Sequence, residues 1–111
     1  MRRIVVALFA VLAVTGSASA HSWYTGTHDP ATGFECCGGG DCAPVPDESV
    51  REVTGGYLYL PTGEFIPMSR VQRSHDWQFH RCIYKRDFLD LARRTFRKGD
   101  TRCFFAPPGS M

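Results

Sequence analysis

The chain has 111 residues, with 13 Lys and Arg against 11 Asp and Glu, five cysteines and a formal net charge of +2. This length holds one small domain, and a nearly balanced charge without aromatic-rich basic strands argues against a nucleic-acid partner. The charges are uneven, however, because residues 21–69 carry one basic and seven acidic residues, whereas residues 70–103 carry ten basic and four acidic ones. We expect the two parts to attract each other within one domain. The alternative is a basic face that binds an anionic glycan or a membrane surface.

The first twenty residues have the pattern of a secretory signal peptide. Arg2 and Arg3 precede an apolar run over residues 4–14, and the small residues at 18–20 are typical of a cleavage site. The apolar run is too short to span a bilayer. We therefore expect residues 1–20 to be removed and residues 21–111 to form a single domain in the periplasm or outside the cell. A competing cut after Ala18 would leave Ser19 at the start.

The first part of the mature chain predicts a loop followed by three strands. Residues 21–47 are rich in Gly, Pro and Asp and contain three cysteines, which indicates a loop ordered by disulfides. Residues 50–54 and 57–60 predict a hairpin around a Gly-Gly turn, and residues 64–68 predict a third strand. Pro67 predicts that this strand lies at a sheet edge or ends early, because proline has no N–H to donate.

The second part of the chain predicts two strands around a helix. Residues 77–84 alternate, with His80, Cys82 and Tyr84 on one face, and residues 102–106 form the last strand. Between them, residues 87–98 carry an apolar stripe at helical spacing, formed by Phe88, Leu91, Ala92 and Phe96. The expected fold is α+β: a small antiparallel sheet with one helix and a disulfide-stapled N-terminal loop.

Five cysteines in a short exported chain are typical of a disulfide framework with one thiol left over. Cys82 and Cys103 lie in the strands that flank the expected helix. The preferred pairing therefore joins these two and joins Cys42 to Cys36 or Cys37, since adjacent cysteines rarely bridge each other. Cross-pairing between the N-terminal loop and the two strands is the alternative. The fifth cysteine is expected to be a buried thiol, an intermolecular disulfide, or a reactive thiol or metal ligand.

Cleavage after Ala20 would place an amine and an imidazole on one residue, His21. With a second imidazole they form a three-nitrogen site that suits Cu(II). This arrangement resembles the histidine brace of copper monooxygenases and of periplasmic copper carriers; the resemblance covers His21 alone and implies only the metal chemistry. The second ligand is expected to be His28 or His80, and His75 is a further candidate.

The sequence also supports alternative interpretations of these histidines. The cut after Ala18 would leave His21 third from the amino terminus, where the amine, two deprotonated amides and the imidazole also bind Cu(II). For His80 the alternative is a packed histidine that is hydrogen-bonded to a carboxylate. Asp29 and Asp41 are candidates for orienting an imidazole.

No catalytic motif stands out, and we favour a binding protein over an enzyme. Ser74, His75 and Asp76 contain the residue types of a triad, but neighbours in sequence seldom form one, and no Gly-x-Ser-x-Gly motif is present. Three aromatic residues predict either an exposed patch that stacks on sugars or packing in the core: Trp23, Tyr24 and Trp77.

Four motifs span nearly the whole mature chain: His-Ser-Trp-Tyr at 21–24, Cys-Cys followed by Asp-Cys-x-Pro-Val within 36–45, Ser-x-Asp-x-x-Phe-His-x-Cys at 74–82, and Cys-Phe-Phe-x-Pro-Pro at 103–108. Together they resemble a group of small exported proteins of Gram-negative bacteria and their prophages. The resemblance implies export and disulfides, and it implies no particular reaction. It also implies that a cysteine of the group is missing near Asp47, so that Cys36 or Cys37 forms no disulfide.

Overall fold

The computed structural model describes residues 23–38 and 40–109, and the regular structure in these ranges is almost all strand. The signal peptide expected over 1–20 and the proposed ligand His21 lie outside the described residues. The described strands are β1 (Gly40–Val45), β2 (Val50–Val53), β3 (Gly56–Tyr59), β4 (Glu64–Pro67), β5 (Val71–Arg73), β6 (Phe79–Tyr84), β7 (Phe88–Leu89), β8 (Thr95–Phe96) and β9 (Thr101–Ala106), with two short 3-10 turns, η1 (Asp47–Ser49) and η2 (Met68–Arg70). The expected α+β class is wrong, because the described chain is mostly β.

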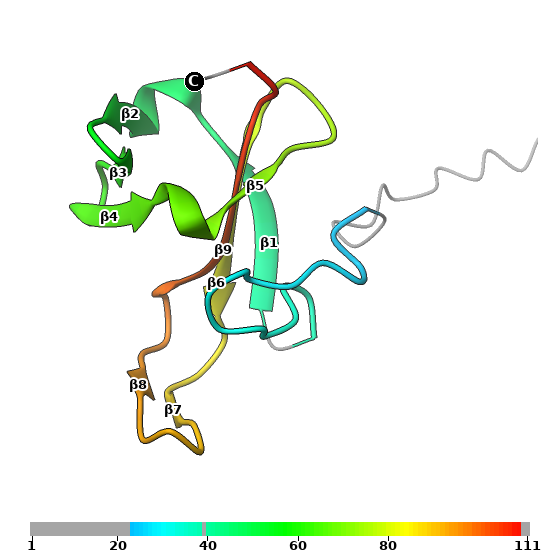
Figure 1. Ribbon diagram of the computed structural model, residues 1–111, viewed down its shortest axis with the longest axis vertical. Coiled ribbons are helices and arrows are strands. Elements are labelled where there is room, and N and C mark those ends of the chain that lie inside the picture. The colour runs from blue at the N-terminus through cyan, green and yellow to red at the C-terminus, as the bar shows by residue number, and fades with distance from the viewer. Residues whose placement is uncertain (1–22, 39, 110–111) are drawn as a thin grey trace, which may run out of the picture.

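A four-stranded sheet in the order β1-β6-β9-β5 forms the centre of the fold (Figure 1). β6 pairs antiparallel with β1 and β9, whereas β5 pairs parallel with β9, so the sheet is mixed rather than purely antiparallel. β1 occupies a stretch that the sequence predicts as loop. It is an edge strand, where Pro44 is tolerated because its missing N–H breaks no ladder inside the sheet. Gly40 starts β1 without room for a side chain, since a Cβ would lie 2.4 Å from the carbonyl oxygen of Cys36.

A second sheet, β2-β3-β4, consists of two consecutive antiparallel hairpins. Val53 pairs with Gly56, and Gly55 in the turn between them has a φ of +84°, a conformation that favours glycine. Gly56 packs directly on β4, because a Cβ there would lie 2.1 Å from the carbonyl oxygen of Ile66. The predicted hairpin is confirmed, and so is the edge position of the third strand, which ends at Pro67.

Residues 87–98 form a hairpin, and the predicted helix is wrong. Phe88 of β7 pairs with Phe96 of β8, and their rings stack with centroids 4.9 Å apart. Asp90 closes the turn, because its carboxylate accepts hydrogen bonds from the backbone N–H and from Nε of Arg94, both at 2.7 Å. The rings of the two phenylalanines also pack against the Tyr84 ring, with centroid separations of 5.5 and 5.0 Å. The spacing of the apolar residues is compatible with a helix or with a hairpin. Packing of the two phenylalanines against Tyr84 of β6 favours the hairpin and outweighs the helical preference.

β9 carries the core on both of its faces. Phe104 packs with Tyr57 and Ile66 of the second sheet, whereas Phe105 packs with Tyr24 and the disulfide cysteines. Both phenylalanines are buried. Since successive side chains of a strand point to opposite faces, two neighbouring residues hold the second sheet on one side and the N-terminal loop on the other.

Two disulfides tie the N-terminal loop and β1 to the central sheet. Cys36 bonds Cys103, and Cys42 bonds Cys82. The preferred pairing, which joined Cys82 to Cys103 and Cys42 to Cys36 or Cys37, is therefore wrong in both of its bonds, and the alternative cross-pairing is present. Cys82 and Cys103 do lie opposite each other on β6 and β9, but each is bonded to a different partner. Cys37 keeps its thiol. Two disulfides indicate an oxidising compartment.

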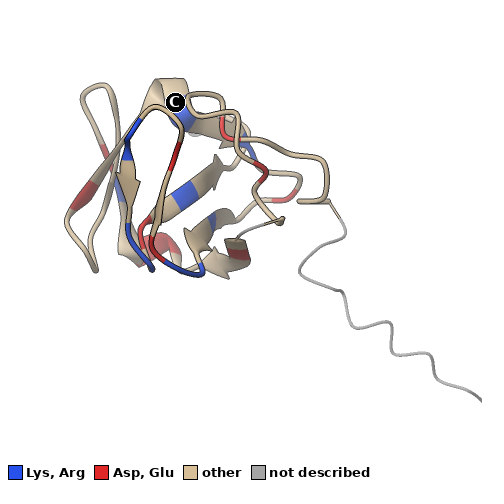
Figure 2. Cartoon of the chain, turned by 90° about the horizontal axis from the view of Figure 1, so that it is seen from below, with Lys and Arg blue, Asp and Glu red and all other residues tan. Residues whose placement is uncertain are grey.

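Opposite charges from the two parts of the chain meet within the domain, and acidic and basic segments are interspersed in Figure 2. Asp29 is fully buried and accepts a hydrogen bond from Nε of Arg70 at 3.1 Å. The ion pairs that join residues 21–69 to residues 70–103 in the described chain include Asp29–Arg70, Asp41–Lys85 and Glu64–Arg81. These pairs support attraction between the acidic and basic parts. Across the described ranges, no helix has the length and apolar character that crossing a membrane requires.

Candidate functional site

A hydrogen-bonded chain of four side chains lies where the N-terminal loop meets β6. His80 is 3 % exposed, and its two ring nitrogens face Asp76 and Tyr24. A carboxylate can only accept, so Nε2 donates to Oδ1 of Asp76 at 2.8 Å; when the ring is neutral, Nδ1 is then left to accept from the Tyr24 hydroxyl. Ser74 Oγ donates to the same carboxylate oxygen at 2.8 Å. His80 is thus a packed histidine bonded to a carboxylate, as one of the two sequence readings expected.

The bend between β5 and β6 positions the acid of this network. The backbone N–H of Gln78 donates to Oδ1 of Asp76 at 2.9 Å, and the N–H of Asp76 donates to Ser74 Oγ at 3.2 Å. Burial favours the protonated carboxyl, but hydrogen bonds from His80, Ser74 and Gln78 together hold the pKa of Asp76 below its ordinary value. Burial and, secondarily, the nearby Asp76 raise the pKa of Tyr24 to about 12. The phenol therefore stays protonated and remains a donor.

Trp23 brings two histidines to one place. Its ring stacks on His75, with centroids 4.6 Å apart and planes 19° from parallel, and meets His80 edge-on at 4.8 Å. Residues 75 and 80 would face opposite ways on a continuous strand, and the bend over 74–78 removes that constraint. His75 is exposed, whereas Trp23 is partly buried. Trp23 also lies only two residues after the predicted ligand His21, which is outside the described residues.

The remaining predicted site residues lie in other surroundings. His28 donates from Nδ1 to the carbonyl of Gly26 at 3.1 Å, and its Nε2 lies 4.0 Å from a Glu35 carboxylate oxygen. Neither acid proposed to orient an imidazole is shown in that role: Asp29 binds Arg70, and Asp41 pairs with Lys85. Of the three aromatic residues considered for a patch, Trp23 and Tyr24 pack in the core cluster, and Trp77 is 80 % exposed.

Sulfur atoms form a second cluster under the N-terminal loop. The Sγ atoms of Cys36, Cys82 and Cys103 lie within 4.8 Å of one another. Three such atoms have metal-ligand spacing, but here each belongs to a disulfide, and an oxidised sulfur is not a thiolate ligand. Cys37 adds a thiol 3.9 Å from Sγ of Cys42. The sequence already favours a position of Cys42 near Cys36 or Cys37. It gave no signal that Cys42 would be bonded to Cys82 with the Cys37 thiol beside that disulfide, because this pairing depends on strand register.

A third feature combines aromatic rings with arginines. The guanidinium of Arg102 lies over the rings of Phe34 and Tyr84, at 5.5 and 5.1 Å from their centroids. The Tyr84 hydroxyl is buried and has no hydrogen-bond partner among the described residues. A pocket of about 340 Å³ is lined by Phe34, Gly38, Tyr84, Arg86, Phe88 and Arg102. Its composition suits a ligand with a negative charge and an apolar face.

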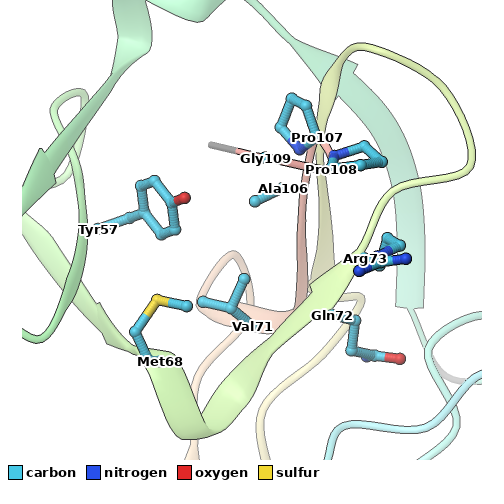
Figure 3. Close-up of a pocket in the computed structure, with 9 residues that line it drawn as sticks. All are labelled: Tyr57, Met68, Val71, Gln72, Arg73, Ala106, Pro107, Pro108 and Gly109. Atoms are coloured by element: carbon cyan, nitrogen blue, oxygen red, sulfur yellow. The ribbon is translucent and has the colours of Figure 1, made fainter. Parts of the chain in front are cut away.

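A further cavity, of about 190 Å³, lies between the second sheet and β5 (Figure 3). Tyr57 and Met68 are on one side of it, facing Val71 and Ala106 across the space. Arg73 is the only ionisable side chain in its described lining apart from the phenol of Tyr57. No protein family, curated protein or solved structure matches this chain.

Proposed function

We propose that the mature protein, exported to the periplasm or the medium, binds one Cu(II) through the amine and imidazole of His21 and the imidazole of His75. The stacking of Trp23 on His75 carries the proposal. Two residues of extended chain span about 7 Å, so a terminus two residues before Trp23 is long enough to reach the His75 ring, against which Trp23 stacks. Amine and imidazole nitrogens in this number suit Cu(II) above the other divalent ions.

The choice of His75 over His80 and His28 follows from their hydrogen bonds. Both nitrogens of His80 are already engaged, by Asp76 and Tyr24, and metal ligation would break one of these buried contacts. His28 forms an antiparallel bridge with Glu35 within the N-terminal loop, and its Nε2 faces the Glu35 carboxylate. The exposed ring of His75 has no hydrogen-bond partner among the described residues, and ring stacking fixes its place. It is the imidazole that a metal takes at least cost.

The first experiment establishes the amino terminus and the ligand set together. Intact mass of the protein purified from its native host shows whether the chain starts at His21 or at Ser19. Cu(II) is then added to mature protein carrying Cys37→Ser, which removes the thiol as a reductant, and its electron paramagnetic resonance spectrum is recorded. We expect a nitrogen-rich signal at one equivalent. One alanine added before His21 should abolish it, and an unchanged spectrum in that variant would exclude the brace.

A fluorescence titration tests the second ligand. The chain has two tryptophans, and Trp77 is 80 % exposed, so Trp77→Phe leaves Trp23 as the only indole with little structural cost. Cu(II) bound beside Trp23 should quench its emission at one equivalent. His75→Ala should raise the copper concentration needed for this quenching at least tenfold. The matched variant His28→Ala should leave that concentration unchanged. Equal titrations for the two histidine variants would contradict the choice of His75.

A second candidate function is binding of an anionic glycan at the pocket that contains Arg86 and Arg102. The aromatic rings that line this pocket and its two guanidinium groups favour such a ligand. Heparin serves as the probe, with neutral dextran as its control and anionic vesicles as the test for a membrane surface. Arg86→Gln should weaken heparin binding and reduce its salt dependence, whereas Arg51→Gln, exposed on β2, should not. Equal loss in both variants would indicate non-specific charge attraction.

A further inference from the structure

The thiol of Cys37 lies beside a disulfide that it can attack. Its Sγ is 3.9 Å from Sγ of Cys42, which is bonded to Cys82. Cys37 is half-buried, whereas Cys82 is completely buried. We propose that Cys37 is the nucleophile of an intramolecular thiol–disulfide exchange, which transfers the thiol from the half-buried position to the interior of the sheet.

The exchange balances without an external oxidant or reductant. The thiolate of Cys37 attacks Sγ of Cys42, and a Cys37–Cys42 bond forms as the Cys42–Cys82 bond breaks. The electron pair of the broken bond goes to Cys82, which leaves as a thiolate and takes up a proton equivalent to the one that Cys37 lost. One disulfide and one thiol are present before and after. Cys37 and Cys42 are five residues apart, and three consecutive glycines follow Cys37 in the sequence, which eases the closure of a small ring.

A second exchange of the same kind is open to Cys82. Its Sγ lies within 4.8 Å of both sulfurs of the Cys36–Cys103 disulfide. Attack on Cys103 forms a Cys82–Cys103 bond between facing positions of β6 and β9, and it releases Cys36 as the thiol. Together with Cys37–Cys42, this is one of the two pairings that the sequence favours. The two pairings are therefore isomers connected by two exchange steps.

The surroundings of Cys37 set the pH range of the exchange. Burial raises the pKa of its thiol; Lys85 opposes this shift and Glu35 adds to it. Tyr24 also faces the thiol, since a charge on Cys37 raises the pKa of the phenol. The thiolate is consequently a minor form at neutral pH, and the exchange should accelerate as pH rises toward the thiol pKa.

Disulfide mapping tests the exchange in the wild-type protein. The oxidised protein is held at neutral and at mildly alkaline pH, quenched with acid, unfolded in acidic urea and labelled with N-ethylmaleimide. Peptide mass spectrometry then locates the label. We expect label on Cys82 or Cys36 as well as on Cys37, in a fraction that is approached faster at the higher pH, and loss of that label in Cys37→Ser. Label confined to Cys37 under all conditions would overturn the proposal.

A second variant tests whether the two sulfurs can bond. Cys82→Ala leaves Cys42 without its disulfide partner and keeps Cys36–Cys103 intact. After air oxidation we expect a Cys37–Cys42 disulfide and no thiol by intact mass. Persistence of two thiols, at Cys37 and Cys42, in a protein that retains Cys36–Cys103 would contradict the proposed attack. The measurement uses no copper, so it succeeds or fails independently of the metal proposal.

Discussion

Tyr24 and His80 are 56 positions apart in the sequence and meet through a buried hydrogen bond between the phenol and Nδ1. This bond joins the N-terminal loop to β6 and directs the other ring nitrogen toward Asp76. The bond therefore holds His80 in place. It also holds Trp23, the residue before Tyr24, whose ring lies against His75.

Loss of this phenol should destabilise the fold. Tyr24→Phe keeps the ring but leaves Nδ1 of a histidine that is only 3 % exposed without its donor. An unsatisfied buried acceptor costs about 1–3 kcal/mol, and we expect a decrease of that size in the free energy of unfolding, measured by urea titration of the oxidised protein. Tyr59→Phe is the control, because the ring under Arg81 is retained. A loss equal to that of the control would show that the bond contributes nothing net.

Asp76 should make the fold sensitive to acid. Its pKa in the folded protein is held below the unfolded value, so its charge stabilises the fold above that unfolded value, about 3.9. That contribution is lost as pH falls through the folded pKa. Asp76→Asn should therefore be less stable than wild type at neutral pH, with the difference shrinking below about pH 4. Urea titrations across pH measure this, and Asp47→Asn, which changes an exposed side chain, should show no such convergence.

Removal of the long-range disulfide should cost more than removal of the thiol. Cys36 and Cys103 are 67 positions apart, and a loop of this length corresponds to about 4 kcal/mol of unfolded-state entropy. We expect the double variant Cys36→Ala, Cys103→Ala to lose about that much free energy of unfolding. Cys37→Ser should change it by less than about 1 kcal/mol. Similar losses in both would mean that the native state, rather than the unfolded chain, determines the effect.

The two faces of β9 should respond separately to truncation. Phe104→Ala opens a cavity against the second sheet, and a fully buried phenylalanine replaced by alanine costs about 3–5 kcal/mol. The emission of Trp23 should be unaffected at low denaturant, because Phe105, and not Phe104, contacts the indole. Phe65→Ala, at a side chain that is 48 % exposed, should cost much less. A shifted Trp23 spectrum in folded Phe104→Ala would show that the two clusters are coupled.

The strands that sequence reasoning found are those with local signals. β2, β3 and β4 follow from turn glycines and from Pro67, and β6 follows from alternation that buries His80, Cys82 and Tyr84. β1 was missed because Gly40 and Pro44 disfavour strands, and only the edge position beside β6 explains their tolerance. The β7–β8 hairpin was mistaken for a helix because Phe88 and Phe96 can share a helix face as well as stack across a hairpin.

In the candidate site too, the sequence indicated the residue types, and the tertiary structure determined their contacts. Sequence alone identified the histidines and the cysteines as the residues with chemistry, because their side-chain types carry it wherever they lie. It could not pair Cys36 with Cys103, place Trp23 on His75 or show that both nitrogens of His80 are engaged. Local turns and alternation are properties of neighbouring residues, and the amino-acid order determines them. Contacts across tens of positions depend on how the sheets pack and on strand register, and only the tertiary structure decided these.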